Sequence, residues 1–372
     1  MKDFHSSVGC LLFWFLMPLT VQAQDWKYSG TVTILTTKDG ANLPAEAYVE
    51  GFPILVTLHK DFFKFEQARP GGEDLRVFSS KDEPLPFQID EWLPAEGRAR
   101  IWVRIPKIEG DSRQPITLKW GNPEAESLSN GKAVFNQTNG YLSVWHMSDP
   151  VQDEVGTLPS QDTGTSPVGG VVGSARHFPG KKGIFCGDAI TTYPLGASSH
   201  STEAWFRAQA PNTTIIGWGN EGGGRGSKVR MQFRSPPHLH IDSDFADVDA
   251  ERSLPLNEWI HVVHSYDRED GKLYINGQLA GQARPLMDIK RPLRLWLGGW
   301  YDNYDFAGDL DEVRISSVAR SLEWVRLVYE NLKPAQTLVG PVIQEGSLLS
   351  VSDKALKIDE GEQAILTADA SY

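Results

Sequence analysis

The chain has 372 residues, with 35 glycines, 23 prolines and 10% aromatic residues, and this length provides for two or three domains that each bury a core. Its formal net charge is −12 at pH 7, and the lysines and arginines are scattered along the chain. This charge pattern argues against a nucleic-acid partner and against an anionic membrane surface.

The first 23 residues have the pattern of a secretory signal peptide. Lys2 precedes an apolar run from Leu11 to Leu19, and Val21 and Ala23 are the small residues that a signal peptidase accepts. We therefore expect export, with a mature chain that begins at Gln24 and is secreted, periplasmic or held at the cell surface. No later segment has the roughly 20 apolar residues that a transmembrane helix needs.

Removal of residues 1–23 leaves Cys186 as the single cysteine. An internal disulfide is thereby excluded, so packing alone must hold the exported chain together. Cys186 lies in the apolar, strand-like run GIFCGDAI, where thiols are usually unreactive. We do not expect it to act as a nucleophile.

Residues 24–135 are predicted to form a small β-sandwich. Short alternating segments, each bounded by glycine, proline, aspartate or serine, are its expected strands. They are TVTIL, FPILVTL, DLRVFS, LPFQIDEW, RARIWVRIP and PITLKWGNP. In the fifth segment, alternation places Ile101 and Ile105 in the core and Trp102 on the solvent side, between two arginines.

Four motifs of this region resemble domain-of-unknown-function family 2341. They are DLRVF (Asp74–Phe78), LPFQIDEW (Leu85–Trp92), IWVRIP (Ile101–Pro106) and LKWGNP (Leu118–Pro123). The family more often has tyrosine where this chain has Trp120. It occurs near the start of exported, multi-module bacterial proteins, where some members precede laminin-G-like modules and others an ExbB-type proton channel. No activity is established for the family, so the resemblance implies architecture only.

Residues 136–335 are predicted to form a second, larger β-domain. Its expected strands lie in SARHFPG, STEAWFRAQ, TTIIGWGN, KVRMQFRS, HLHIDSD, EWIHVVHSYD, KLYINGQLAG, RLWLGGW and GDLDEVRIS. Asn276-Gly277 between two alternating runs predicts a tight hairpin. Helical spacing of apolar residues from Ser321 to Lys333 predicts a closing helix with Ser321 as its N-cap.

The segments WIHVVHSYD, GKLYINGQLAG, LRLWLGG and GDLDEVRI resemble the laminin-G-like, concanavalin A-type jelly roll. This resemblance implies a binding or adhesion module and names no ligand. The predicted fold class is therefore all-β, with a small β-sandwich followed by a concanavalin A-like jelly-roll β-sandwich. In the last segment, alternation places Asp311 on the buried side with Val313 and Ile315, where a carboxylate must be paired, hydrogen-bonded or metal-bound.

Residues 336–372 end in VSDKALKIDEGEQAILTADASY, which reads as the first two strands of an immunoglobulin-like module with Gly361 at the turn. Such a module needs roughly 100 residues. We therefore expect residues 336–372 to be the start of an incomplete module, and the chain to be a fragment of a longer protein. The alternative is that these strands pack back on the jelly roll.

Catalytic motifs are scarce. Glycoside hydrolases on this jelly roll carry an E-x-D-x-x-E strand, and no such run occurs here. Alternation places Asp309 and Asp311 on one face of their strand and Glu312 on the other. We therefore predict a non-catalytic protein.

Histidine pairs give two different expectations. His261 and His264 are three residues apart in a strand and point to opposite faces, so they cannot share a metal. His238 and His240 share a face and are followed by Asp242, an arrangement that could bind a transition metal. A solvated strand edge is the alternative.

Two candidate sites remain. Asp242, Asp244 and Asp247 lie in the acidic loop IDSDFADVDA, whose clustered oxygens suit calcium, although a solvated acidic loop is the alternative. The second site combines aromatic faces with polar groups that can hold a sugar, and packing of the loop over the sandwich is its alternative. Its members are Trp296, Trp300, Tyr301, Asp302, Asn303, Tyr304 and Asp305.

The sequence thus predicts an exported, non-catalytic modular protein with a lectin-like domain that binds carbohydrate or another extracellular ligand, such as a protein. Calcium is the one expected cofactor. A glycosidase or polysaccharide lyase on the same jelly roll is one alternative. A structural or assembly module, such as the N-terminal part of a larger envelope protein with an ExbB-type channel, is the other.

Overall fold

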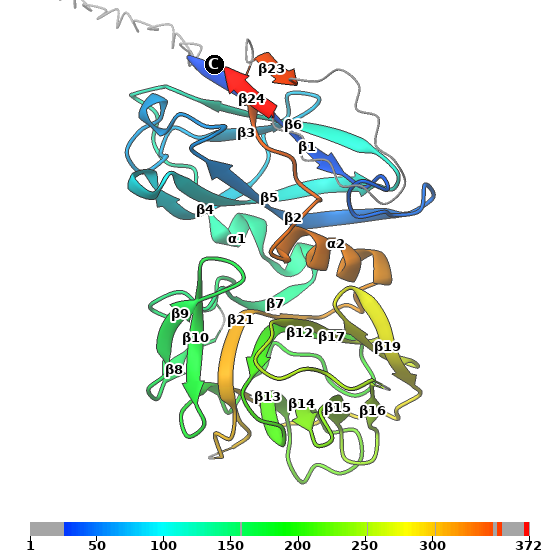
Figure 1. The fold of residues 1–372 in the computed structure, drawn as a ribbon. Helices are drawn as coiled ribbons and strands as arrows, with labels where there is room; N and C mark the ends of the chain where they lie inside the picture. Colours follow the sequence, from blue (N-terminus) through cyan, green and yellow to red (C-terminus); the bar gives the residue numbers. More distant parts are fainter. Residues whose placement is uncertain are drawn as a thin grey trace, which may run out of the picture.

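The computed structural model describes residues 26–156, 158–250, 252–301, 303–344, 348–351 and 368–371. It contains two stacked β-sandwiches with the helices α1 (Gly131–Val134) and α2 (Leu322–Leu332) between them (Figure 1). The predicted all-β class is confirmed. Among the described residues, no helix is long and apolar enough to cross a membrane. The predicted signal peptide lies outside the described part of the chain.

The first sandwich consists of a four-stranded sheet in the order β22-β1-β6-β3 and a three-stranded sheet in the order β2-β5-β4. All six segments predicted as strands form strands here. Their bounds are β1 (Tyr28–Leu35), β2 (Tyr48–His59), β3 (Arg76–Ser79), β4 (Phe87–Leu93), β5 (Arg98–Glu109) and β6 (Arg113–Trp120). Short 3-10 helices span Phe65–Gln67, Pro94–Glu96 and Gln137–Asn139.

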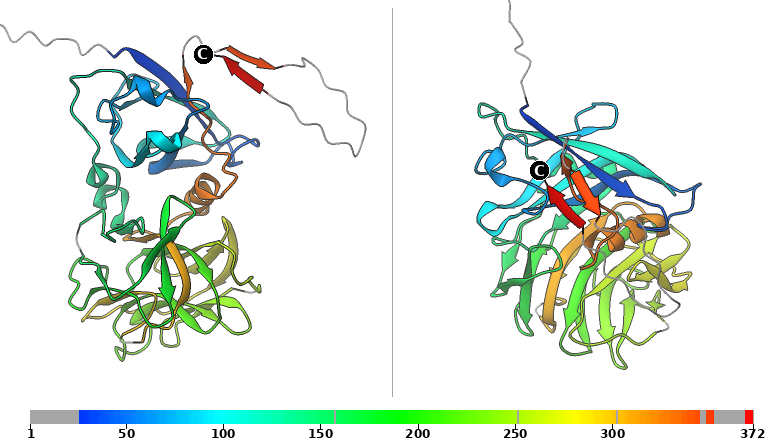
Figure 2. Two further views of the ribbon diagram at one scale, coloured as in Figure 1. Left: turned by 60° about the vertical axis from the view of Figure 1, so that its left-hand side comes forward. Right: turned by 45° about the horizontal axis from the view of Figure 1, so that its top comes forward.

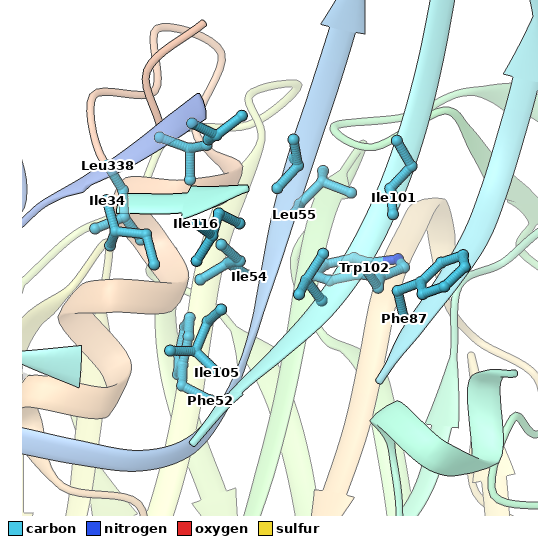
Figure 3. Close-up of a cluster of buried hydrophobic side chains, with 14 of the residues drawn as sticks. Ile34, Phe52, Ile54, Leu55, Phe87, Ile101, Trp102, Ile105, Ile116 and Leu338 are labelled. Carbon is cyan, nitrogen blue, oxygen red and sulfur yellow. The ribbon is translucent and has the colours of Figure 1, made fainter. Parts of the chain in front are cut away.

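The seventh strand of this sandwich comes from the other end of the chain. After α2 the chain returns to the first sandwich, where β22 (Ile343–Gln344) pairs antiparallel with β1. The backbone N–H of Leu35 donates to the carbonyl of Leu338 over 2.7 Å, and the Leu338 side chain lies in the core near Ile34 (Figure 3).

The predicted start of an immunoglobulin-like module at residue 336 therefore needs a correction. Residues 338–344 belong to the first sandwich, because Leu338, Val339 and Val342 are buried in its core. Beyond them, β23 (Leu348–Val351) and β24 (Ala368–Ser371) pair antiparallel. Most of the remaining predicted module lies outside the described residues.

The second sandwich is a jelly roll of two larger sheets. The eight-stranded sheet has the order β19-β18-β17-β12-β21-β10-β9, with β7 paired to β21, and the seven-stranded sheet has the order β16-β15-β14-β13-β20-β11-β8. The first contains β7 (Tyr141–Trp145), β9 (Ser166–Gly169), β10 (Ser174–Pro179), β12 (His200–Ala208), β17 (Ile260–Tyr266), β18 (Gly271–Ile275), β19 (Gln278–Ala283) and β21 (Ala307–Ser316). The second contains β8 (Gln161–Asp162), β11 (Ile184–Gly187), β13 (Thr213–Gly219), β14 (Lys228–Arg234), β15 (His238–Asp242), β16 (Val248–Asp249) and β20 (Arg294–Leu297).

Local signals that the sequence carries are confirmed in this domain. Asn276 and Gly277 form the turn between β18 and β19 with φ of 50° and 76°, as an Asn-Gly hairpin requires. Helix α2 begins at Leu322, and the Ser321 hydroxyl accepts a hydrogen bond from the Trp324 N–H as its N-cap. His261 and His264 point to opposite faces of β17, toward α2 and toward the jelly-roll core respectively.

Strand β21 departs from simple alternation at a β-bulge. Its pairing with β12 shifts between the partners Glu203 and Trp205, and Glu312 has a φ of 46°. The bulge leaves Val313 and Ile315 in the jelly-roll core but turns Asp311 to the opposite face, so the prediction that these three share a face is wrong.

The carboxylates at this bulge are buried and bonded. Asp311 accepts hydrogen bonds from the N–H groups of Val172 and Glu312, both over 2.9 Å. Burial, together with the charge of Glu312, raises the pKa of Asp311 well above its usual value. Glu312 forms an ion pair with Arg314. The prediction that Glu312 points to the opposite face from Asp309 and Asp311 is therefore also wrong.

One apolar cluster joins the two domains. Trp205 of β12 and Trp324 of α2 belong to the same continuous core as the first sandwich. Trp102 of β5 is fully buried, with the His146 ring stacked on it at 5.3 Å and the Arg314 guanidinium 5.1 Å from its centroid. The expectation that Trp102 faces solvent is wrong, because the second domain covers this side of β5.

Polar contacts fix the same interface. The Asn331 amide of α2 accepts from the Leu55 N–H over 2.6 Å and donates to the Leu55 carbonyl over 3.0 Å. The eight-stranded sheet of the jelly roll thus has much of its outer face against α2 and the first sandwich, while the seven-stranded sheet lies on the far side (Figures 1 and 2).

Replacing Asn331 with alanine leaves the buried N–H and C=O of Leu55 unpaired. We expect Asn331→Ala to lower the free energy of unfolding of the full chain by about 2 to 4 kcal/mol, measured by urea denaturation. Gln278→Ala, an exposed amide on β19, is the control and should stay within about 0.5 kcal/mol of the wild type. Equal stabilities of the two variants would contradict this role for Asn331.

His146 gives the interface a pH dependence. Burial alone lowers its pKa, but the charge and hydrogen bond of Glu312 at 2.8 Å, with the charges of Asp90 and Glu154, raise it from 6.5 to about 9. A raised folded-state pKa gives stability that is complete below pH 6.5 and is lost as the pH rises toward 9.

We therefore expect the free energy of unfolding to fall between pH 6.5 and about 9. The variant His146→Gln keeps a polar group beside Glu312 but has no proton to lose, so its stability should change less over this range. Denaturant titrations across the range measure both profiles. Parallel profiles for the two proteins would rule out His146 as the titrating group.

Candidate functional site

The outer face of the seven-stranded sheet carries large polar and aromatic side chains. On β14, alternation turns Val229, Met231 and Phe233 into the core, and on β20 it turns Leu295 and Leu297 into the core. The side chains left on the outer face of these two strands are Lys228, Arg230, Gln232, Arg234, Arg294 and Trp296. This face offers cations beside an indole ring.

An aromatic cluster of Trp296, Trp300 and Tyr301 lies on this face. The rings of Trp296 and Tyr301 stack at 4.8 Å with an interplanar angle of 22°. The Arg294 guanidinium carbon lies 4.9 Å from the centre of the Tyr301 ring. A tight turn holds Tyr301 there with a φ of 54°, closed by hydrogen bonds of 3.0 and 3.2 Å between the backbones of Trp300 and Asn303.

The three rings differ in exposure. Trp296 and Trp300 are only 5% and 6% exposed, whereas Tyr301 is partly exposed. Trp300 packs on Gly217, where a Cβ would meet its ring at 2.3 Å, and its Nε1–H donates to Glu221. For Trp300 the structure agrees with the alternative of packing over the sandwich: its ring supports the cluster, and Tyr301 is the ring that a ligand can reach.

The other predicted ligand-binding residues have different surroundings. Asp305 accepts from the Thr214 N–H over 2.7 Å, and burial raises its pKa in spite of this hydrogen bond. Tyr304 is partly exposed and packs against Gly183, and Asn303 is exposed. Asp302 lies outside the described residues. The structure therefore gathers the two tryptophans and Tyr301 but directs Asp305 to the backbone of β13.

The predicted calcium loop surrounds a lysine. The Lys228 ammonium lies 2.8 Å from Asp244, 2.8 Å from Glu221 and 3.6 Å from Asp242, and its side chain is 2% exposed. Burial alone lowers the pKa of Lys228, but hydrogen bonds to Asp244 and Glu221 raise it above its usual value. Asp247 instead accepts from the Ser243 N–H over 2.8 Å.

Sequence reasoning missed Lys228 and Glu221. The pairing register of β14 and β15 places these residues at the acidic loop, and a single sequence does not give this register. Arg230 pairs with Asp242, so the outer face of β14 lies beside the loop. A protein cation therefore already occupies the space between Asp242 and Asp244. Nothing tests the calcium prediction directly, but the carboxylates would have to give up Lys228 to bind the ion, which argues against calcium binding by the wild type.

The carboxylates Asp309 and Glu312 of β21 are bonded to basic side chains. Asp309 contacts His177 over 2.8 Å and Arg207 over 2.7 Å. Glu312 contacts His146 and Arg314 in the buried interface between the domains.

Comparison with known proteins agrees with this architecture. Residues 187–326 match the family profile of the Concanavalin A-like lectin/glucanases superfamily. This part of the chain is a concanavalin A-like domain. Residues 71–144 match the Domain of unknown function (DUF2341), so the two families occur in the order that the sequence motifs predict.

Individual relatives match parts of the chain. Pappalysin-1 of Mus musculus is 36% identical over 80 residues, which is 20% of this chain and 5% of that protein. Among solved structures, domain 4 of AbnA, an extracellular GH43 arabinanase from Geobacillus stearothermophilus in complex with arabinotriose, is 20% identical, with a TM-score of 0.42 and coverage of 50% of this chain and 97% of that one.

The botulinum neurotoxin serotype D binding domain is 17% identical, with a TM-score of 0.42 and coverage of 51% of this chain and 50% of that one. The sialidase of Trypanosoma rangeli is 13% identical, with a TM-score of 0.41 and coverage of 59% and 41%.

The bonding of Lys228 leads to a test with calcium. We expect the melting temperature of the wild type to be the same in calcium and in chelator, because the ammonium holds the carboxylates. Lys228→Gln removes the ammonium group from Glu221, Asp242 and Asp244, so calcium should raise the melting temperature of this variant by mass action. A calcium-dependent rise in the wild type that Asp244→Ala abolishes would contradict this expectation and establish the calcium site.

Proposed function

We propose that this chain is a non-catalytic binding protein whose jelly roll binds carbohydrate through the aromatic cluster. One observation carries the proposal: the partly exposed ring of Tyr301 is stacked on Trp296 and flanked by Arg294, on the sheet face that the first sandwich leaves uncovered. Trp296 and the Arg294 guanidinium hold this ring in place, and its exposed part is available to the apolar face of a sugar.

Polar groups around the ring suit the hydroxyls of a sugar. The Arg294 Nε–H is buried and has no hydrogen-bond partner among the described residues, so it becomes a donor beside Tyr301 when the Arg294 side chain moves toward a ligand. Glu221 donates its N–H to the Tyr301 hydroxyl over 3.2 Å and accepts from Trp300 through its carboxylate. The cluster thus combines an aromatic face with a few placed polar groups, the usual composition of a small-ligand site.

The first sandwich has an orienting role in this proposal. It covers the opposite sheet of the jelly roll through Trp205 and α2, so the ligand-binding face points away from it. A secreted, periplasmic or cell-surface location fits a carbohydrate or an extracellular protein as the partner. The proposal for location rests on the signal-like residues 1–23.

A glycan array with the full chain tests the proposal. Loss of a ring that stacks on a sugar costs on the order of 1 to 3 kcal/mol, so Tyr301→Ala should weaken binding by about tenfold or more. The matched control is Tyr48→Ala, which removes a tyrosine that is 59% exposed in the first sandwich and should leave binding unchanged. Trp300→Ala should lower stability as well as binding, because its ring is buried.

The results separate the alternatives. Equal binding by Tyr301→Ala and the wild type would place the site elsewhere on the jelly roll. An array without any binding would favour a structural or assembly module. Release of sugar from a bound glycan during incubation would favour a glycosidase or lyase.

A further inference from the structure

Two histidines and an aspartate meet at the edge of the seven-stranded sheet. His238 and His240 lie on the outer face of β15, because Leu239 and Ile241 fill the core. Strand β16 pairs with β15 so that Asp249 lies directly opposite His240. The third member of this group is thus Asp249, and not Asp242 as the H-x-H-x-D spacing predicts, since Asp242 lies beside Lys228 and Arg230.

The three side chains converge. One potential ligand atom of each lies within 4.8 Å of the others. His240 Nδ1 is 2.7 Å and His238 Nε2 is 3.3 Å from Asp249 Oδ1. Two imidazole nitrogens therefore face the same carboxylate oxygen.

The tautomer of His238 is fixed by its other nitrogen. His238 Nδ1 lies 2.7 Å from the carbonyl oxygen of Pro236, which can only accept a hydrogen bond. Nδ1 must therefore carry the proton, and neutral His238 directs the lone pair of Nε2 toward Asp249. Histidines that bind metals usually have this arrangement, with the second ring N–H donated to a carbonyl or carboxylate.

The second histidine has an unsatisfied nitrogen. His240 is 3% exposed, and its Nε2 has no hydrogen-bond partner among the described residues. The carboxylate oxygen Asp247 Oδ2 lies 4.0 Å from this nitrogen. A metal ion on Nδ1 would leave the proton on Nε2, where Asp247 can serve as an outer-shell acceptor after a small movement.

We propose that His238, His240 and Asp249 bind a divalent transition metal ion of the zinc type. Two imidazole nitrogens and one carboxylate oxygen, with water in the fourth position, form a common open zinc site. Nitrogen ligands favour zinc, copper or nickel over calcium, which prefers oxygen.

The spacing needs one adjustment. Metal–ligand bonds of about 2.0 to 2.1 Å in a tetrahedral site place ligand atoms roughly 3.3 Å apart. The separation of His238 Nε2 from Asp249 Oδ1 is already 3.3 Å, and His240 Nδ1 must move away from its present 2.7 Å. The Asp249 side chain is 58% exposed and can make this movement at little cost.

Neighbouring charges act in both directions. Arg234 lies on β14, directly opposite His238 on β15. Its guanidinium donates hydrogen bonds to Gln232 over 3.1 and 2.8 Å. Its positive charge opposes the ion, while Asp247 and Asp249 supply two negative charges. The site is three strands from Trp296 on β20, or roughly 14 Å, so it is separate from the aromatic cluster.

Calorimetric titration of the full, tag-free chain with zinc chloride tests the proposal. The wild type should bind one equivalent of zinc that calcium does not replace. His238→Ala and Asp249→Asn each remove a ligand and should weaken this binding by at least about 10- to 100-fold. Thermal unfolding without metal shows that each variant is folded.

The control is another histidine–aspartate pair. His59 Nδ1 lies 3.0 Å from Asp61 on the surface of the first sandwich. No second histidine among the described residues completes a metal-binding group with this pair. His59→Ala should therefore bind zinc as the wild type does. Any background binding by the other histidines is common to all variants and cancels in the comparison. Equal zinc affinity in His238→Ala, Asp249→Asn and the wild type, or an equal loss in His59→Ala, would overturn the proposal.

Discussion

The rest of the structure depends on the burial of one surface, the outer face of the eight-stranded sheet, against α2 and the first sandwich. Trp102 from one domain and Trp205 and Trp324 from the other lie in a single apolar cluster, and each large aromatic ring removes on the order of 150 to 250 Å² from water. This burial, together with the returning strand β22, makes the two domains one unit. It also leaves the jelly roll with only one open sheet, and so determines which face can meet a ligand.

Charged groups of the jelly roll are buried within this surface. Arg314 is paired with Glu312 over 2.6 Å and with Glu203 over 3.2 Å, and all three are buried. Buried ions contribute little net stability, but one left without its partner is costly. These pairs are complete within β12 and β21, so the first sandwich covers them without leaving an unpaired charge. The bulge at Glu312 turns Asp311 out of the jelly-roll core, onto the same face as Glu312 and Arg314.

The sequence predicts the elements that depend on the spacing of residues within one segment. It misses the features that depend on which distant segments pack over a given face. Strands, the Asn276-Gly277 turn and the cap at Ser321 follow from patterns within a few residues. Alternation alone, however, separates the two faces of a strand without showing whether another domain covers the second face. For this reason it predicts Trp102 on the solvent side. The bulge at Glu312 has a positive φ at a non-glycine residue, so the residue type does not indicate it in the sequence. In the candidate site, composition located the aromatic loop and the acidic loop, whereas the burial of Trp300 and the position of Lys228 arise from pairing between distant strands.

Oxidative footprinting of the full chain, read by mass spectrometry, tests the shared burial most directly. If the domains form one unit, Trp102 and Trp205 are protected as well as Trp218 in the jelly-roll core, while Tyr301 and Phe245, which is 85% exposed, are oxidised. Domains that move independently would expose the interface between them. Oxidation of Trp102 and Trp205 at the rate of the exposed Tyr48 would contradict the account.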